Sequence, residues 1–445
     1  MNGLLVIRWL AVAVLTVTAF SGLRLNAGEF LAGADLSHLR FFEDRGIVYR
    51  EAGQAGDAPT LLRARGLNCV RLRLFTSSSA QAQADPYNFV NNLEYTVPLA
   101  VRVKQAGFKL LLNFHYSDTW ADPGKQTKPA AWNELSFADL EREMVRYNSN
   151  CLAAFIAAGA RPDFVQIGNE ITGGMLWPDG RVGGAYDTPV QWSQLARLIR
   201  AATRGIRDAA GDSPPEIILH LDRGGDWPGT QWFFDRLRQE SVEFDGIGQS
   251  YYPFWHGGLD ALRLCLNQTA LRYGKPVILM ETAFPWTQSA PVVGLPATPE
   301  GQARYVAELA RIVQNVPQGR GRGIVWWGAE YQQLNGVGTA GFEHRSFFDA
   351  AGEVLLAVDS LGQLTKPVTL QAAISGTNLL LSWPLSGAGW RLTSASQLNA
   401  SEPWASTVVT PKLGTNVTAS LEFPGEEPRF FRLESPENGV VPQSP

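Results

Sequence analysis

The sequence predicts an α/β fold, a (β/α)8 or TIM barrel, with a small C-terminal all-β sandwich domain. Short apolar segments recur eight times at wide intervals, and segments with helical spacing of apolar residues lie between them. Near residue 360 the pattern changes to closely spaced strands without helices. A doubly wound open sheet is the alternative, but the chain has no GxGxxG or P-loop motif to support it.

The eight apolar segments have the length and residue types of strands that are buried on both faces of a parallel sheet. In chain order they are residues 30–36, 68–75, 108–115, 163–170, 216–222, 244–252, 276–282 and 323–328. The connecting segments repeat apolar residues with the period of a helix, most clearly in residues 93–107, 136–160, 192–211 and 298–316. Glycines at positions 66, 107 and 159 stand where helices of this kind end.

The C-terminal segment contains turn residues between short runs of strand type, at residues 367–375, 378–384, 389–396, 406–410, 416–423 and 428–435. We therefore expect a barrel over residues 28–360, a β-sandwich over residues 361–435 and a disordered tail over residues 436–445. The sandwich has three candidate roles: binding polysaccharide, anchoring the protein or stabilising the barrel. Core packing is the expected fate of at least two of the tryptophans Trp383, Trp390 and Trp404.

The N-terminal segment has the form of an export signal. Arg8 precedes the apolar run WLAVAVLTVTAF, and Ala27 offers a small residue for cleavage, so we expect a signal peptide over residues 1–27. The run is short for a membrane span, and no other segment has the character of one. An uncleaved anchor stays open as an alternative. The expected location is outside the cell or in a periplasm, and we expect a monomer.

The composition excludes several classes of protein. The 38 basic and 42 acidic side chains give a formal net charge of −4, whereas nucleic-acid and membrane-surface proteins carry a basic excess. The cysteines Cys69, Cys151 and Cys265 are far apart, and without a CxxC spacing they predict neither a zinc site nor a redox motif. We expect Cys69 to be buried and inert, and a Cys151–Cys265 bridge stays open.

Polar residues gather at the ends of the eight predicted strands. The active site of this type of barrel lies at the C-terminal ends of the strands, so these side chains are expected to converge on one rim. In strand order they are Asp35; Arg71 and Arg73; Asn113 and His115; Asn169 and Glu170; His220 and Asp222; Tyr251 and Tyr252; Glu281; and Trp326 and Trp327. A lone glutamate at such a position is more often part of a structural ion pair. Two glutamates, together with Asn169, His115 and the tryptophans, favour a catalytic role.

Glu170 and Glu281 are expected nearly opposite each other across the barrel. Hydrolysis of a glycosidic bond requires two carboxyl groups, one that donates a proton and one that is ionised. We predict Glu170 as acid/base and Glu281 as nucleophile, with Arg71 or Arg73 and Tyr251 or Tyr252 keeping Glu281 charged. Asn169 is placed to hold a sugar hydroxyl.

The remaining polar residues have less specific expectations. Asp35 and Asp222 either bind a sugar hydroxyl or fix a loop, and the sequence favours neither. His115 and His220 are expected to orient neighbours by hydrogen bonds rather than to bind a metal, because no HxH or HExxH motif is present.

Long blocks in a fixed order give the chain a resemblance to glycoside hydrolase family 53, the endo-β-1,4-galactanases. They are GADLS (33–37), VRLRLF (70–75), NFHYSDTWADPGKQTKPAAW (113–132), VQIGNEITGGMLWPDG (165–180), LHLDRGGD (219–226), SYYPFWHG (250–257) and METAFPWT (280–287). The resemblance covers roughly residues 30 to 330 and does not include the C-terminal β domain.

The resemblance implies a retaining hydrolase that cleaves β-1,4-linked galactan, the side chain of type I arabinogalactan in pectin. The family's acid/base falls on Glu170 and its nucleophile on Glu281. The loop with Asp118, Trp120, Asp122, Lys125 and Gln126 is expected to form part of the cleft, whereas packing within the loop is favoured for Trp132. The expected substrate-binding residues are Asp35, Arg71, His115, Asp118, Trp120, Asn169, Asp222, Tyr252, Trp286 and Trp327.

Two departures from the family pattern concern the last part of the barrel. Gly328 stands where the family commonly has an acid after its last strand, and Glu330 comes later. Some bacterial members hold calcium in the loops after strands seven and eight, but the segment TQSAPVVGLPATPEG has no acidic residue before Glu300. We predict no calcium there, no other metal and no cofactor.

Two other functions are compatible with the sequence. One is a related barrel glycosidase that acts on another β-linked glycan. The other is a barrel that binds glycan without cleaving it, against which the presence of both glutamates counts.

Overall fold

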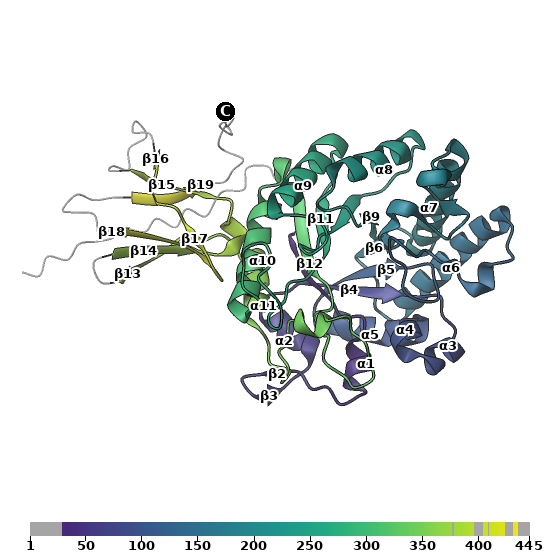
Figure 1. Cartoon of the computed structure of the whole chain (residues 1–445), viewed down its shortest axis with the longest axis horizontal. Coiled ribbons are helices and arrows are strands. Elements are labelled where there is room, and N and C mark those ends of the chain that lie inside the picture. Colours follow the sequence, from purple (N-terminus) through teal and green to yellow (C-terminus); the bar gives the residue numbers. More distant parts are fainter. Residues whose placement is uncertain (1–28, 376–377, 396–403, 408, 423–429, 435–445) are drawn as a thin grey trace, which may run out of the picture.

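The computed structural model describes residues 29–375, 378–395, 404–407, 409–422 and 430–434 (Figure 1). The expected signal peptide and C-terminal tail lie outside the described residues. A helix long and apolar enough to cross a membrane does not occur in the described part of the chain.

Eight parallel strands close into a barrel in the order β1-β12-β11-β10-β9-β6-β5-β4. They are β1 (Leu31–Asp35), β4 (Cys69–Leu74), β5 (Lys109–Phe114), β6 (Phe164–Ile167), β9 (Glu216–Leu221), β10 (Gly246–Ser250), β11 (Val277–Thr282) and β12 (Gly321–Trp326). Each corresponds to one of the eight predicted apolar segments. Because β1 pairs with both β4 and β12, the sheet has no edge and the open-sheet alternative is wrong.

Helices surround the barrel strands (Figure 1). They are α1 (Leu39–Glu43), α2 (Ala58–Ala64), α3 (Ser79–Ala84), α4 (Pro86–Phe89), α5 (Leu93–Gln105), α6 (Phe137–Ala157), α7 (Pro189–Ala210), α8 (Trp227–Gln239), α9 (Leu259–Tyr273), α10 (Pro299–Gln314) and α11 (Leu356–Gly362). Short 3-10 helices are η1 (Ala130–Trp132), η2 (Ile171–Gly173), η3 (Gly184–Tyr186), η4 (Pro317–Gly319), η5 (Phe342–His344), η6 (Gln363–Thr365) and η7 (Leu385–Gly387).

Local sequence signals begin and end the long helices. The hydroxyls of Ser136, Thr188 and Thr298 accept a backbone N–H in the first turns of α6, α7 and α10. Gly107 and Gly159 follow α5 and α6 with φ of 86° and 76°, values that glycine adopts without steric cost. The four predicted helical segments are therefore confirmed as α5, α6, α7 and α10.

The C-terminal segment forms two antiparallel sheets, a four-stranded one in the order β13-β14-β18-β17 and a three-stranded one in the order β16-β15-β19. The strands are β13 (Gln371–Ser375), β14 (Asn378–Trp383), β15 (Arg391–Ala395), β16 (Ala405–Ser406), β17 (Lys412–Leu413), β18 (Val417–Glu422) and β19 (Phe430–Glu434). Trp383 is buried in the core, whereas Trp390 and Trp404 are half-buried. Core packing was predicted for at least two of these three tryptophans, and the structure buries one.

The β-sheets lie beside α10 and α11 of the barrel (Figure 1). The contact is close at Gly389, where a β-carbon would stand 2.4 Å from Oδ1 of Asn315 at the end of α10. Leu385 is fully buried at the same junction. A side chain at Gly389 would displace the side chain of Asn315, so the two regions are in direct contact at this point.

The remaining strands are two small hairpins, β2 (Arg50–Glu51) with β3 (Gln54–Ala55) and β7 (Gly174–Met175) with β8 (Gly180–Arg181). Cys69, Cys151 and Cys265 are all free and buried, so the Cys151–Cys265 bridge does not form. Burial raises the pKa of the Cys69 and Cys151 thiols to about 12, which keeps both protonated and unreactive.

Candidate active site

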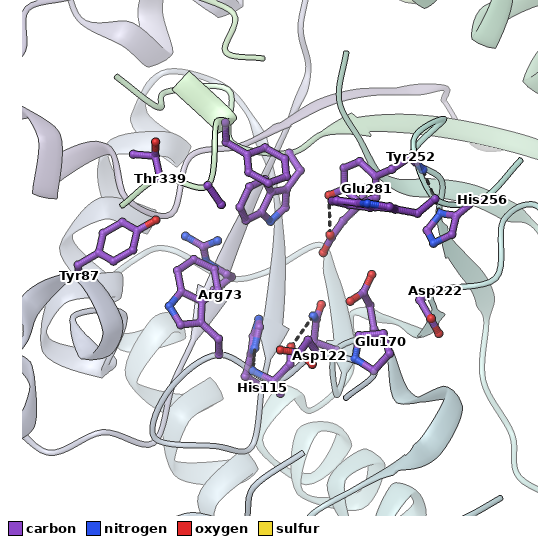
Figure 2. A pocket seen from close by; sticks show the side chains of 18 residues that line it. Arg73, Tyr87, His115, Asp122, Glu170, Asp222, Tyr252, His256, Glu281 and Thr339 are labelled. Carbon is purple, nitrogen blue, oxygen red and sulfur yellow. Dashed lines mark hydrogen bonds between the residues drawn. The ribbon is translucent and has the colours of Figure 1, made fainter. Parts of the chain in front are cut away.

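A cleft of about 550 Å³ opens at the C-terminal ends of the barrel strands (Figure 2). It brings together eight of the twelve residues predicted for the site: His115, Trp120, Asn169, Glu170, Asp222, Tyr252, Glu281 and Trp327. The two glutamates come from β11 and from the loop after β6. Both side chains point into the same space (Figure 2).

The sharp turn after β6 directs Glu170 into the cleft. Gly168 has a φ of 72°, and a β-carbon at this position would lie 2.5 Å from Cγ2 of Ile171. Glu170 itself has a φ of 50°, a left-handed conformation that is unfavourable for a glutamate. Strain of this kind persists only where the surroundings enforce it, which is typical of functional positions.

Glu281 is the fifth residue of β11 and is held by two partners. Nη2 of Arg71 lies 2.8 Å from its Oε1, and the hydroxyl of Tyr252 donates to its Oε2 at 2.9 Å. The pairing between β10 and β11 is irregular at Gln249 and Ser250, which aligns Ser250 with Glu281. Such irregularities re-aim side chains next to active sites.

The two carboxyl groups differ in electrostatic environment. Burial raises the pKa of Glu170 well above its ordinary value, and the charge of Glu281 raises it further. Burial also raises the pKa of Glu281, but the Arg71 guanidinium and the Tyr252 hydroxyl oppose this rise. The arrangement therefore favours a proton on Glu170 and a negative charge on Glu281, which is the division of roles that acid-assisted displacement needs.

Asn169 joins four strands of the barrel through its side-chain amide. Its Oδ1 accepts hydrogen bonds from Nη2 of Arg71 at 2.8 Å and from Nε2 of Gln166 at 3.1 Å. Its Nδ2 donates to the carbonyl of Ala121 at 2.9 Å, and only one hydrogen of that amide is used in this bond. The other hydrogen is available at the cleft, which Asn169 lines.

The two rim histidines are neutral. Burial and the nearby arginines lower the pKa of His115 and of His220 well below its ordinary value. Nδ1 of His115 accepts from the backbone N–H of Ala121 at 3.0 Å, which ties it to the loop after β5. Nε2 of His220 lies 2.9 Å from the hydroxyl of Ser250. Both histidines are thus placed to orient neighbours by hydrogen bonds.

An aromatic wall forms the other side of the cleft. Trp120 and Trp327 lie with ring centroids 6.2 Å apart, and Phe342 packs against Trp327 at 4.1 Å. The guanidinium carbon of Arg73 lies 4.1 Å from the Trp120 ring and 5.6 Å from the Trp327 ring, a cation–π arrangement. Flat apolar faces of this kind match the apolar faces of sugar rings.

Four predicted residues do not line the cleft: Asp35, Arg71, Asp118 and Trp286. Asp35 accepts from Arg71 at 3.0 Å, and Arg71 in turn pairs with Glu281, so this buried pair supports Glu281 without lining the cleft. Asp118 accepts from the Thr76 hydroxyl at 2.7 Å, and Nε1 of Trp286 donates to the Glu343 carbonyl at 3.2 Å. For these four, the contacts fix neighbouring segments, whereas the sequence led us to expect direct contact with substrate.

Several lining residues were absent from the expected substrate-binding residues. They are Arg73, Tyr87, Asp122, Trp255, His256, Thr339 and Phe342, together with smaller residues. Of these, Arg73 was expected only at the rim, and Asp122 only as part of the loop that forms the cleft. Arg73, Asp122 and the segment with Trp255 and His256 lie inside the sequence blocks quoted above, so a signal was present. Thr339 and Phe342 belong to a long irregular loop after β12, where no periodicity indicates which side chains face the cleft.

Glu330, the acid that follows Gly328, is buried beneath the cleft. Its Oε1 accepts from the backbone N–H of His38 at 2.7 Å, and its carbonyl accepts from the Tyr49 hydroxyl at 2.6 Å. Burial raises its pKa to about 8. Glu330 therefore connects this loop to His38 and Tyr49 and does not line the cleft.

Trp132, expected to pack within its loop, is buried against Tyr147 with ring centroids 5.3 Å apart. Among the described residues, no group of three or more histidine, cysteine, aspartate or glutamate side chains is arranged to hold a metal ion.

Comparison with known proteins gives a consistent match over the barrel. A model described as glycosyl hydrolase family 53 matches residues 31–361. A protein of Niallia circulans, named only as an uncharacterized protein in the bgaB 5' region, is 44% identical over 318 residues, which is 68% of this chain and 84% of that protein. The arabinogalactan endo-beta-1,4-galactanase of Humicola insolens is 33% identical over 337 residues, 73% of this chain and 96% of its own length.

A solved structure, the GH53 catalytic domain of Ignisphaera aggregans, aligns with a TM-score of 0.68 and 32% identity, and covers 76% of this chain and 96% of that chain. Each of these alignments covers more than two thirds of this chain and more than four fifths of the relative.

Proposed function

The chain belongs to glycosyl hydrolase family 53 and is a glycoside hydrolase, and from this premise we propose that it is a retaining endo-β-1,4-galactanase. The proposed substrate is the β-1,4-linked galactan of type I arabinogalactan. The name of the Humicola insolens relative, arabinogalactan endo-beta-1,4-galactanase, supports this substrate. Glu170 is the acid/base and Glu281 the nucleophile. The observation that carries the assignment is the Arg71–Glu281 ion pair facing the proton-binding Glu170 in one cleft.

The proposed first step breaks the bond between the sugar's anomeric carbon and the glycosidic oxygen. Glu281 attacks the anomeric carbon and forms a glycosyl ester, while Glu170 gives its proton to the departing oxygen. In the second step Glu170, now ionised, takes a proton from water, and the water oxygen displaces Glu281. Both carboxyl groups return to their starting state, and two inversions restore the original anomeric configuration.

The charge environment changes in the direction that each step requires. When Glu281 becomes an ester it loses its negative charge, and that charge is one cause of the raised pKa of Glu170. The pKa of Glu170 therefore falls at the moment when it must act as a base. Arg71 and Tyr252 stabilise the Glu281 carboxylate when it departs from the sugar.

We also infer, from the N-terminal segment, that the enzyme is exported and acts on pectic polysaccharide outside the cytoplasm. We propose in addition that it acts as a monomer without metal or cofactor. Export fits the substrate, because a polymer of this size cannot enter a cell intact. N-terminal sequencing of the protein recovered outside the cytoplasm tests this inference, and a chain that still begins at Met1 would contradict cleavage near Ala27.

The proposal is tested by reducing-sugar release from galactan, arabinogalactan, mannan and glucan. We expect release from the two galactose-containing polymers, a loss of about 10²- to 10⁴-fold in Glu170→Ala, and a loss of at least about 10⁴-fold in Glu281→Ala. Glu216→Gln is the matched control, because this glutamate occupies the opposite end of a barrel strand, where it pairs with Arg322. Hydrolysis that survives in both alanine variants would remove the catalytic assignment, and preferential cleavage of mannan or glucan would remove the substrate.

A further inference from the structure

Trp255 is a large exposed aromatic residue on the rim of the cleft. It lies in the loop after β10 and is 62% exposed, although it contacts Tyr252 with ring centroids 5.1 Å apart. The indole ring is both exposed and part of the cleft lining, and ligand-binding clefts are lined predominantly by apolar and aromatic side chains. One face of this ring is therefore available to a ligand in the cleft.

His256 presents a hydrogen-bond donor at the same place. Its Nδ1 accepts from the backbone N–H of Tyr252 at 3.0 Å, and a backbone N–H can only donate. Burial lowers the pKa of His256, so the ring is neutral and its single proton is on Nε2. Within the part of the chain that the structure describes, this N–H has no hydrogen-bond partner, and His256 lines the cleft.

Asp222 supplies an acceptor beside this donor. Its Oδ1 accepts from the Thr172 hydroxyl, and its side chain is 13% exposed and faces the cleft. Oδ2 of Asp222 has no hydrogen-bond partner among the residues described. The charge of Asp222 acts on both His256 and Glu170, which places all three at one end of the cleft (Figure 2).

The backbone around these residues is packed too tightly to rearrange. A β-carbon at Gly225 would lie 1.7 Å from the carbonyl oxygen of His256, and one at Gly224 would lie 2.6 Å from that of Ser250. The hydroxyl of Tyr251 donates to the carbonyl of Gly257 at 2.7 Å. The loop that carries Asp222 and the loop that carries Trp255 and His256 are thus locked together. A preorganised donor, acceptor and aromatic face lower the entropy lost on binding.

The position of this group relative to the glutamates gives its role. Arg73, Tyr87 and Thr339 lie at the opposite end of the cleft, and Glu170 lies toward the Asp222 end (Figure 2). In glycoside hydrolysis the acid stands on the side of the departing oxygen. We propose that Trp255, His256 and Asp222 form the subsite for the first galactose unit of the leaving chain, which stacks on Trp255 and exchanges hydroxyl hydrogen bonds with His256 and Asp222.

This subsite rests on the proposed galactanase function and specifies how the leaving part of the substrate is held. Binding energy from a part of the substrate that does not react is used to lower the barrier at the reacting bond. The subsite therefore matters for substrates with a sugar leaving group and is irrelevant for substrates whose leaving group has no ring.

The test compares galactotetraose with β-1,4-galactobiosyl fluoride, whose leaving group is a single atom. For Trp255→Ala we expect kcat/KM on galactotetraose to fall by ten- to a hundredfold, and kcat/KM on the fluoride to change by less than about threefold. His256→Ala is expected to lose about fivefold on galactotetraose alone. Trp255→Phe, which keeps an aromatic face, is expected to recover most of the tetraose activity.

Leu271→Ala is the control for loss of an exposed apolar side chain, since Leu271 is 52% exposed on α9 and does not line the cleft. Activity on the fluoride also shows that each variant is folded. Equal losses on both substrates in Trp255→Ala, or no loss on either, would overturn the subsite. A wild-type enzyme that cleaves neither substrate would instead overturn the galactanase function, and the subsite with it.

Discussion

Replacement of Arg71 by methionine tests the electrostatic design of the site. The Arg71 side chain is fully buried and lies 3.0 Å from Oδ2 of Asp35 and 2.8 Å from Oε1 of Glu281. Its Nε donates to Gln166 at 3.0 Å. Methionine keeps the apolar stem and removes the charge, so two buried carboxylates lose the one guanidinium that they share. The effect on stability and the effect on the pH dependence of catalysis follow from the same contacts.

The loss of stability is expected to be large. Removal of one partner of a buried ion pair leaves an uncompensated charge and costs about 3–5 kcal/mol of unfolding free energy. Arg102 is the matched control, because it also pairs with two carboxylates, Glu43 and Asp57, both at 2.6 Å. Its side chain is 31% exposed, so solvent screens the charges, and Arg102→Met is expected to cost about 1 kcal/mol or less.

Catalysis is expected to shift toward higher pH in the same variant. Arg71 lowers the pKa of Glu281, so its removal raises that pKa. In the proposed mechanism Glu281 must be ionised to attack, so the ascending limb of the kcat/KM profile on galactan is expected to move to higher pH. The difference in unfolding free energy between Arg71→Met and the wild type should become smaller as the pH falls, because protonation removes the unpaired negative charge.

Urea unfolding at pH 5 and pH 7, together with the pH profile of kcat/KM, measures both effects. Asp35→Asn added to Arg71→Met should restore part of the lost stability, because it removes one of the two unpaired charges. The reasoning would be refuted if Arg71→Met destabilised the protein no more than Arg102→Met. It would also be refuted if the ascending limb of the pH profile stayed in place.

Three further predictions concern the charge of Asp222, the packing at Gly225 and the absence of a bound cation. Asp222→Asn removes a charge that raises the pKa of Glu170, so the descending limb of the kcat/KM profile should move to lower pH, and a shift to higher pH would contradict this reading. Gly225→Ala places a β-carbon 1.7 Å from a backbone oxygen and should lower the unfolding free energy by about 1–3 kcal/mol, whereas Gly258→Ala, with no atom within 4 Å, should be close to neutral in urea unfolding. The melting temperature should be the same with and without a chelator, and a decrease in chelator would mean that the loops after β11 and β12 hold a cation.

Most of the eight strands were predictable because a strand buried on both faces is a largely apolar run, although β4 also contains Arg71 and Arg73, and β10 contains Gln249 and Ser250. The helices α6, α7 and α10 were predictable from their length and clear amphipathic pattern. The sequence did not single out α8 or α9. The weak amphipathic pattern of α9 accounts for its omission, whereas α8 is as amphipathic as α6 but has fewer residues over which the period repeats.

The sequence was sufficient to predict which polar residues lie at the C-terminal end of each barrel strand. Glu170 and Glu281 come together because the strands that carry them belong to one closed barrel. The neighbours of each side chain depend on packing between strands, which the sequence does not show. Asp35 and Arg71 were therefore expected to line the cleft, whereas in the structure they pair with each other and do not line it. Trp255 and His256 were within a recognised block, but no pattern in the sequence indicates that an indole ring on a short loop is exposed.

The most direct measurement of the central claim is covalent labelling with an activated 2-deoxy-2-fluoro-β-galactobioside, which slows breakdown of a glycosyl ester. The two carboxyl groups have distinct roles in this account, so peptide mass spectrometry should find the label on Glu281, and Glu281→Gln should remain unlabelled. A label on Glu170 would reverse the assignment. Products of inverted anomeric configuration in ¹H NMR, with no label on either residue, would contradict the retaining mechanism itself.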